Sequence, residues 1–439
     1  MRYSHGGQLR ELFGQQWFAT LLAARLLSQA ADGIFQASLY GALLFNPEHH
    51  TQPAEVAGGL VLLVLPYSLV GPFAGVFLDR WRRQRVLSYG AAIHGIVAGI
   101  SAVLLATLGS RSPVFDVAAF GALAVNRFYL AAQSTALPRI VPDNQLIIGN
   151  ALTTTAGTVV TIIGGGIGLG IRHLVGSGDH GTAIVAGFSF LGYLVAAAVA
   201  TRLPLNRLGP HEPATRSIRH ELAAVASGFV SGTRYLWEHR PAARALGVLY
   251  GHRGLFGLWT IMTLLLYRNT FHDDGPLRAG LVGAGQAATA GGVGLVLAAL
   301  VTPRITRRIG LHKWIAVSTA LPAVTGLALG SPYRMPLYLL SALALGFGIH
   351  ASKVCVDTIV QETIADDYRG RAFAIYDAGS NACFAGMAVV GAFTLPLTGR
   401  SVTTVAAMSA AYLVIAVTYT ATAVPGSSVL AEQAAEEVA

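Results

Sequence analysis

The chain of 439 residues is 53% apolar and only 12% charged, with a mean hydropathy of +0.56 and a net charge of +9. Soluble domains carry about 25% charged residues, so this composition argues against an ordinary soluble enzyme or binding domain. It favours a bilayer protein, in which each spanning helix needs about 20 apolar residues. Cys355 and Cys383 lie in apolar runs and give no disulfide framework and no metal-ligand spacing.

Long apolar segments follow one another along the whole chain and predict twelve transmembrane helices. The longest break between them, residues 204–242, is rich in Arg and Pro and divides them into six and six; part of it, residues 218–237, is compatible with a helix at the membrane surface. In chain order, the predicted helices cover residues 17–45, 54–78, 86–108, 114–137, 146–175, 182–203, 243–268, 279–302, 312–330, 335–361, 371–396 and 401–424.

The predicted fold is therefore an all-α integral membrane protein built from two six-helix bundles. The N-terminal bundle would occupy residues 1–203 and the C-terminal bundle residues 243–424, joined by a cytoplasmic linker at 204–242. Residues 425–439 are polar and acidic and are predicted to be a disordered tail.

The distribution of positive charge orients these helices. If the N-terminus is cytoplasmic, twenty Lys and Arg residues fall in loops on that side and six in the opposite loops. The positive-inside rule then puts both termini and the linker in the cytoplasm. This asymmetry accounts for the basic charge, so no nucleic-acid partner is expected. The use of Arg almost to the exclusion of Lys is typical of a bacterial chain, and we predict a monomeric multi-pass protein of the bacterial inner membrane, surrounded by lipid.

Several charged side chains fall inside the predicted spans. A charge at membrane depth costs several kcal/mol, so such residues normally face a polar interior. With His neutral their sum is +1, which favours an anionic or zwitterionic substrate, or one bound mainly by apolar contacts. These residues are Arg25, Asp32, Arg127, Arg253, Lys353, Asp357 and Asp377.

The first helix carries a polar stripe. Arg25, Gln29, Asp32 and Gln36 recur at spacings of four, three and four residues, which places them on one helical face. Two interpretations of Asp32 stay open. It either carries a proton, because burial disfavours its charged form while Arg25 favours it, or it forms a structural ion pair with Arg25.

The fourth and seventh helices each contribute one arginine. Arg127 is predicted to hold a substrate carboxylate or to tune a proton site, with pairing to Asp32 as the alternative. Arg253 lies on a face of the seventh helix that also carries Thr260 and Thr263, and is predicted to line the cavity.

The tenth and eleventh helices add further polar groups. His350, Lys353 and Asp357 recur at spacings of three and four residues, and Lys353 and Asp357 are placed to neutralise each other as an i,i+4 pair. Asn381 is predicted to line the cavity, whereas Asp377 belongs either to the cavity or to a cytoplasmic gate.

The loop between the second and third helices carries a recognisable motif. The run from Gly75 through Asp79, Arg80 and Arg83 resembles the loop signature of the major facilitator superfamily, G-x-x-x-D-R-x-G-R-R, except that Arg82 stands where the family has its second Gly. The resemblance implies that Asp79 sits at the N-terminus of the eleventh helix, where a carboxylate is favoured by the helix dipole. Together with Asp377, Arg369 and Arg371 it would latch the cytoplasmic side. A plain positive-inside loop is the alternative.

Other stretches resemble a branch of that family. The runs beginning at Leu137, Asn150 and Arg369 are similar to bacterial drug and siderophore exporters, including macrolide-efflux-like members. Glycines between Gly157 and Gly170 resemble the antiporter signature of the fifth helix, although close helix packing explains them equally well.

The resemblance implies proton-coupled efflux of a small amphipathic compound by alternating access. A lipid or lysolipid transporter and a nutrient importer of the same fold are alternatives. A membrane-embedded enzyme would need a His/Asp or Ser/His cluster at a membrane face, and the sequence offers none. The chain also has no G-x-x-x-x-G-K-[ST] motif for ATP, so we expect a proton gradient to drive it, with no cofactor and no metal.

Overall fold

The computed structural model describes residues 11–15, 17–46, 53–78, 80–142, 145–176, 178–205, 208, 227–228, 231–364 and 366–422. Each of the twelve predicted segments corresponds to a helix in it. The first half contains α2 (Phe18–Leu43), α3 (Pro53–Leu78), α4 (Arg83–Leu108), α5 (Pro113–Ala136), α6 (Leu146–Val175) and α7 (Asp179–Ala200), with a short 3-10 turn, η1 (Leu137–Arg139), after α5.

The second half also contains six long helices among the described residues. It contains α9 (Arg240–Asn269), α10 (Gly280–Ile309), α11 (Leu311–Thr325), α12 (Met335–Thr363), α13 (Asp366–Thr394) and α14 (Val402–Thr422), and a π-helical turn, η3 (Gly326–Gly330), prolongs α11. Residues 231–238 of the linker are also helical. The rest of the predicted surface helix, like the tail at 425–439, lies outside the described residues.

Eight of these helices are long and apolar enough to cross a membrane: α4, α5, α6, α7, α10, α11 with η3, α12 and α14. Among the others, α2, α9 and α13 carry most of the interior charges named above. The exposed apolar side chains on the outer surface are those expected of helices that face lipid. On α4, for example, Ile93, Ile96, Ile100 and Val103 are each about half exposed at helical spacing. Such a continuous apolar surface would be a liability in water.

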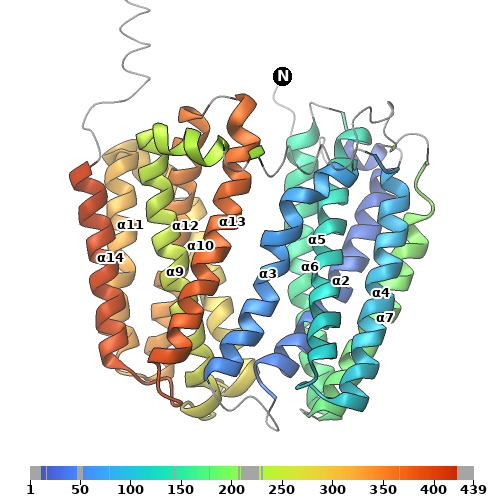
Figure 1. Ribbon diagram of the computed structural model, residues 1–439, viewed down its shortest axis with the longest axis horizontal. Helices are drawn as coiled ribbons and strands as arrows, with labels where there is room; N and C mark the ends of the chain where they lie inside the picture. Colours follow the sequence, from blue (N-terminus) through green and yellow to red (C-terminus); the bar gives the residue numbers. More distant parts are fainter. Residues whose placement is uncertain are drawn as a thin grey trace, which may run out of the picture.

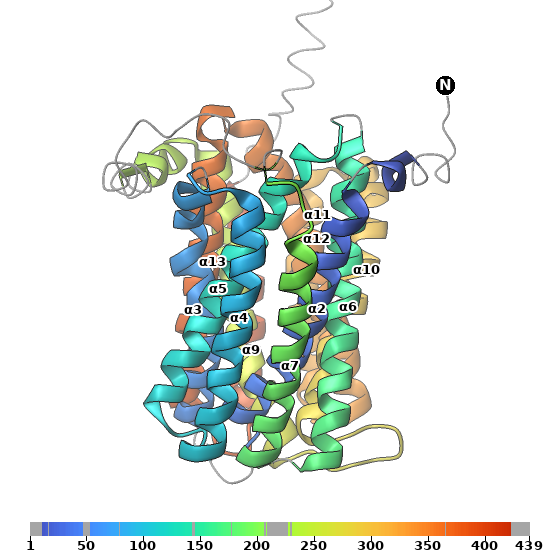
Figure 2. The same cartoon turned by 90° about the vertical axis from the view of Figure 1, so that its right-hand side faces the viewer.

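The helices pack as two groups, α2–α7 and α9–α14 (Figure 1). In the first group α7 packs between α2 and α4 (Figure 2). The same pairs recur in both groups: first helix with fifth (α2 with α6, α9 with α13), third with sixth (α4 with α7, α11 with α14) and second with fourth (α3 with α5, α10 with α12). The two groups therefore share one packing pattern. The exact boundaries at 203, 242 and 424 stay predictions.

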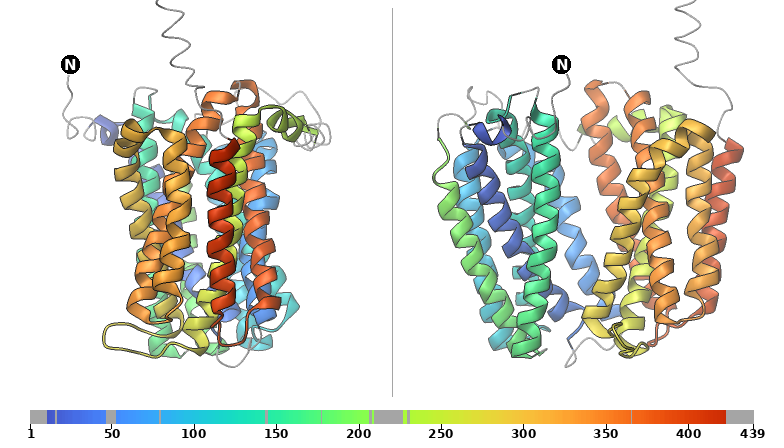
Figure 3. Two further views of the ribbon diagram at one scale, coloured as in Figure 1. Left: turned by 90° about the vertical axis from the view of Figure 1, so that its left-hand side faces the viewer. Right: turned by 180° about the vertical axis from the view of Figure 1, so that it is seen from behind.

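In the described part of the chain the two groups approach each other at one end, where α3 packs against α13, and diverge at the other (Figures 1 and 3). We call the end where α2 begins and α14 ends the near end, and the end where α2 and α9 finish the far end. One buried apolar core runs through both groups toward the far end; it includes Leu43, Leu60, Leu265 and Leu395. At the near end each group has a core of its own, one around Phe18 and Leu78 and the other around Leu246, Ile359 and Tyr419.

An arginine bridges the two groups at the far end. Arg268, in the last turn of α9, donates hydrogen bonds from Nη1 to the carbonyl of Leu44 (2.9 Å) and from Nη2 to the carbonyl of Asn46 (2.8 Å). These carbonyls follow the end of α2, where a helix has free acceptors and the negative end of its dipole. Arg172 of α6 donates to the carbonyl of Phe45 between them (3.4 Å). The far end is thus closed by polar as well as apolar contacts.

Glycines bring α2 and α6 into backbone contact. A Cβ added at Gly164 would lie 2.2 Å from the carbonyl oxygen of Ala30, and one at Gly33 would lie 2.1 Å from that of Thr161. Small residues allow such approach of membrane helices. Gly166, two residues beyond Gly164, faces open space. The predicted packing role of the glycine-rich segment is therefore confirmed at Gly164, while its antiporter role stays a prediction.

We expect Gly164→Ala to destabilise the protein by about 1–3 kcal/mol, as overpacking does, because the added methyl group meets backbone rather than a movable side chain. Gly166→Ala on the same helix is the matched control and should melt like the wild type. Melting in detergent measures both. Equal melting of the two variants and the wild type would show that α2 and α6 are not in backbone contact.

We expect Arg268→Ala to loosen the far end, because it removes two charge-assisted hydrogen bonds worth about 1.5–3 kcal/mol each. Spin labels at Arg111 and Leu397, both exposed at that end, should report a new population at longer distance. Arg278→Ala removes a solvent-exposed arginine of the neighbouring loop and serves as the control. A distance distribution unchanged by Arg268→Ala would contradict the bridging role.

Candidate functional site

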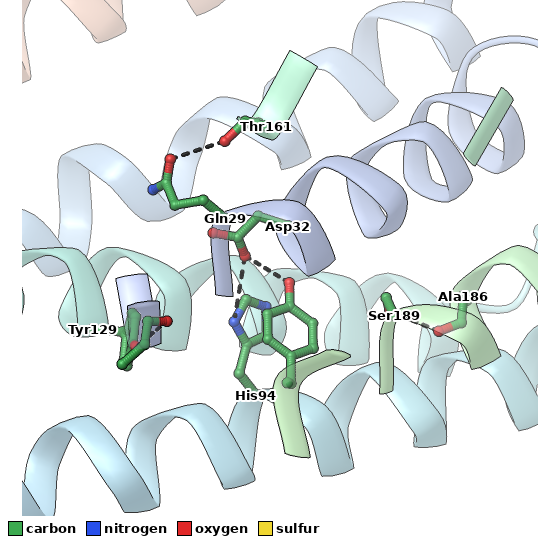
Figure 4. Close-up of polar contacts among 9 residues, drawn as sticks. Gln29, Asp32, His94, Tyr129, Thr161, Ala186 and Ser189 are labelled. Carbon is green, nitrogen blue, oxygen red and sulfur yellow. Dashed lines mark hydrogen bonds and ion pairs between the residues drawn. The ribbon is translucent and has the colours of Figure 1, made fainter. Parts of the chain in front are cut away.

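A buried polar cluster surrounds Asp32 in the middle of the first group (Figure 4). The carboxylate is 2% exposed and accepts a 2.6 Å hydrogen bond from the hydroxyl of Tyr193 on α7. The Nδ1 atom of His94 on α4 lies 3.7 Å from the same carboxylate oxygen, and the His94 ring stacks on Tyr193 with centroids 4.0 Å apart. Asn126 of α5 lies beside the carboxylate. Four helices therefore converge on one acid.

The predicted link between Asp32 and Arg25 is absent. No ion pair joins them, although both lie in the described part of the chain. Arg25 is half-buried beside Gly157 of α6, and its Nε has no hydrogen-bond partner in the structure. Gln29 accepts a 2.8 Å hydrogen bond from Thr161 of α6 (Figure 4). The residues of the stripe thus contact different helices: Asp32 faces α4 and α7, whereas Gln29 faces α6.

His94 is deeply buried, 1% exposed, and neither of its ring nitrogens hydrogen-bonds to another described residue. A buried polar atom without a partner costs about 1–3 kcal/mol. The cost is tolerated here because the ring is fixed from two sides, by the stack on Tyr193 and by an edge contact with Phe35 at 5.9 Å. His94 is therefore held beside Asp32, with Nδ1 3.7 Å from the carboxylate oxygen.

The second group has a cluster on the equivalent helices. His252 on the first helix of that group, α9, is fully buried, and its Nε2 lies 3.1 Å from the Thr319 hydroxyl on α11. The His252 ring contacts Tyr412 on α14, with centroids 5.2 Å apart, and the Thr319 hydroxyl lies 3.3 Å from that of Ser352 on α12. First, third and sixth helices contribute in both halves, but this cluster holds no carboxylate.

A second set of charged groups lies between the two groups of helices. Lys353 and Asp357 form the predicted pair, with Nζ 2.6 Å from Oδ2, and Tyr376 of α13 donates to the other carboxylate oxygen at 2.8 Å. The Lys353 side chain is 41% exposed although it lies about 15 Å along α12 from the near end, at 1.5 Å per residue. Water from the near end therefore reaches it. His350 is half-exposed one turn further in.

Asp377 connects the two halves electrostatically. Its side chain is exposed, and the charges that act on it include Arg127 of α5, in the first group, as well as Lys353 and Arg253 of the second. Because Arg127 and Asp377 stand on different groups, the space between them is the interface of the two bundles. The structure thus brings together Arg127, Arg253, Lys353, Asp357 and Asp377, and leaves Asp32 apart from them.

Arg253 and Asn381 also face each other. The Nη2 atom of Arg253 donates to Oδ1 of Asn381 at 3.3 Å. The guanidinium carbon lies 5.1 Å from the ring centre of Phe384 and 5.8 Å from that of Phe256. Gln36, the last residue of the predicted stripe, is half-buried on α2.

The motif between α3 and α4 is described only in part. Gly75 lies within α3, while Asp79 lies outside the described residues. Arg80 precedes α4, and Arg83 opens that helix, where it is 7% exposed and donates to the carbonyl of Leu208 at 3.4 Å. Arg369 and Arg371 lie in the first turns of α13, with side chains outside the described set. The latch implied by the motif stays a prediction.

Sequence reasoning missed several of these residues. Tyr193, Asn126 and His94 each sit in a predicted apolar span with no signal beyond their depth. Arg268 ends the seventh predicted helix, and its place in the last turn of α9 is a usual position for a cation. Across the described residues, no group of three or more His, Cys, Asp or Glu side chains is arranged to hold a metal ion.

Comparisons with known proteins agree with this architecture. Residues 21–387 match the model of the Major Facilitator Superfamily. Uncharacterized MFS-type transporters of Mycobacterium bovis and Mycobacterium tuberculosis are each 32% identical to the chain over 405 residues, which cover 92% of this chain and 90% of the relative.

Solved structures show the same fold at low identity. The nucleoside transporter NupG superposes with a TM-score of 0.63 at 15% identity, covering 92% of this chain and 98% of that one. A POT family transporter in complex with a thioalcohol-conjugated peptide superposes with a TM-score of 0.68 at 13% identity, covering 92% and 95%. With the two packed groups, the repeated helix pairs and the charged residues between them, these matches lead to one conclusion: the chain belongs to the Major Facilitator Superfamily and is a membrane transporter.

Proposed function

We propose that this transporter exports a small amphipathic compound in exchange for protons, by alternating access. One observation carries the proposal: the two groups share a core at the far end and have separate cores at the near end, with water-accessible charges between them. A central site open to one side and sealed on the other is what alternating access requires. The solved nucleoside and peptide transporters share only the fold, so they do not decide the cargo.

The proposed topology follows from charge. With all twelve helices spanning the bilayer, the near end is cytoplasmic because the Arg-rich loops gather there. The structure then corresponds to an inward-open state in a bacterial inner membrane, with residues 1–203 and 243–424 as the two moving bundles of a monomer. Asp79, Arg80, Arg83, Arg369 and Arg371 would close the near end when the far end opens.

Asp32 is the proposed proton carrier. It is buried among α2, α4, α5 and α7, where the hydroxyl of Tyr193 donates a hydrogen bond to its carboxylate. Protonation would remove a buried charge and so change how these helices pack. His94, 3.7 Å away, is the proposed route by which the proton reaches the acid. In this proposal the distance between Arg127 and Asp377 changes when the bundles move, because the two residues stand on opposite bundles.

Single cysteines on the two sides of α9 test the topology. Glu238 precedes α9 and Asp274 follows it, and both are exposed; the 30-residue helix between them is about 45 Å long. In a Cys383→Ser background, an impermeant maleimide applied to intact cells should label Asp274→Cys and leave Glu238→Cys unlabelled until the cells are opened. Labelling of both from outside would contradict the proposed orientation of α9.

Transport in everted membrane vesicles tests the function. With an acidic lumen, we expect accumulation of at least one of four labelled probes, erythromycin, uridine, dialanine or indole-3-acetate, each standing for one cargo class. Asp32→Asn should abolish accumulation driven by the pH gradient and keep exchange at equal pH, because the neutral side chain mimics the protonated acid. Accumulation only under a reversed gradient would indicate import and contradict export.

Two comparisons separate coupling from structure in this experiment. Asp273→Asn replaces a solvent-exposed loop carboxylate, whose pKa is held below its usual value by the backbone N–H of Ala279 and by Arg278, and should transport like the wild type. If Asp32 were only structural, Asp32→Asn would lower the melting temperature and lose exchange as well. Full gradient-driven accumulation by Asp32→Asn would exclude it as the proton carrier.

A further inference from the structure

Arg253 has more hydrogen-bonding capacity than the structure uses. A guanidinium has five N–H donors and no acceptor, and the neutral amide of Asn381 takes one of them at 3.3 Å. Within the described chain, no carboxylate lies within 4 Å of Arg253. This arginine lies about 20 Å along α9 from the near end, at 1.5 Å per residue. A charge at that depth without an anionic partner is costly unless something else satisfies it.

The neighbouring acids, Asp357 and Asp377, already have other partners. Asp357 binds Lys353 on one oxygen and Tyr376 on the other. Asp377 is shared, since Arg127, Lys353 and Arg253 all act on it. Among the described residues, three basic groups thus face two acids in the space between the bundles. One positive charge remains in excess there, on the side of Arg253.

Aromatic rings extend from the guanidinium along α9. Arg253 lies over Phe384 and Phe256, and the Phe256 ring stacks with that of Trp259 at 6.1 Å and 14°. Phe256 and Trp259 follow Arg253 by three and six residues, a rise of about 4.5 and 9 Å. Both are only partly buried. A row of aromatic rings therefore begins beside the charge and runs about one and a half helical turns away from it, ending where Trp259 stacks on Tyr338 of α12.

We propose that Arg253 binds the anionic group of the substrate, so that the cargo is an organic anion whose apolar or aromatic body lies against Phe256 and Trp259. The inference rests on the proposed transport function and names its substrate class. The planar guanidinium, oriented by Asn381 and by the two rings beneath it, presents its remaining N–H groups to a carboxylate, sulfonate or phosphate oxygen. A cation in the same place would meet Arg127, Arg253 and Lys353 together.

A matched ligand series tests the charge. Indole-3-acetate, indole-3-acetamide and tryptamine share the indole ring and differ in carrying a negative, a neutral and a positive group. Isothermal titration on the purified protein in dodecyl maltoside should give indole-3-acetate an affinity at least about tenfold higher than the other two, a difference that one hydrogen-bonded charge readily supplies.

Variants assign the effect to Arg253. Arg253→Gln should lower the affinity for indole-3-acetate to that of the amide, and Arg253→Lys should keep part of the preference because the charge remains while the planar fork is lost. Arg278→Gln, an exposed loop arginine, should leave all three affinities unchanged. Melting curves confirm that each variant is folded. Equal binding of the three ligands, preference for tryptamine, no binding of the acid at millimolar concentration, or an unchanged preference in Arg253→Gln would each overturn the proposal.

Titration needs neither a gradient nor movement across a membrane, so its failure is distinct from failure of the proposed function. Anion-selective binding without gradient-driven flux in vesicles would leave this site standing and reject proton-coupled export. Gradient-driven flux of a cargo without any anion preference would support proton-coupled export and reject the anion site at Arg253.

Discussion

The contact between the two halves at the far end determines what the rest of the molecule exposes. An apolar core continues through both groups there, and Arg268 binds the carbonyls that end α2. Among the described residues, each group has a separate core at the near end. Because the described halves join toward the far end, Lys353 and Asp377 stay accessible to water, although Lys353 belongs to a long apolar helix. A transporter needs this asymmetry, since a site open at both ends would leak and a site closed at both would not exchange its cargo.

The two buried histidine clusters show how a repeated architecture acquires different chemistry in its halves. The first, third and sixth helices meet in each group, and each meeting point holds a histidine and a tyrosine. In the first group the third partner is Asp32, whereas in the second it is the hydroxyl of Thr319. A carboxylate changes its charge on protonation and a hydroxyl pair does not. The first helix carries Asp32 in one group and His252 in the other, and the third helix carries His94 in one and Thr319 in the other. The repeat therefore supplies the meeting point, and the residues placed on it restrict the proposed proton chemistry to one bundle.

The proposed proton carrier and the proposed anion site occupy different places. Asp32 lies inside the first bundle, while Arg253 stands on α9 against Phe384. Proton and cargo would then communicate through helix packing rather than through direct contact. The close backbone approach of α2 and α6 at Gly164 suits this, because helices packed without intervening side chains move together. Arg127 and Asp377, on opposite bundles, are the charges that such a movement would bring together or separate.

The sequence by itself determined the twelve helices, their division into six and six, the family and the depth at which each charge lies. These are local properties: an apolar run of about 20 residues forms a helix whatever surrounds it in a bilayer. The i,i+4 pair of Lys353 and Asp357 was predictable for the same reason. Contacts between residues that are distant in sequence could not be predicted in this way. Asp32 binds Tyr193, 161 residues away, rather than Arg25 two turns along its own helix. That choice depends on how each helix is rotated against its neighbours, which is set by the combined shapes of side chains on several helices and is decided only when they pack.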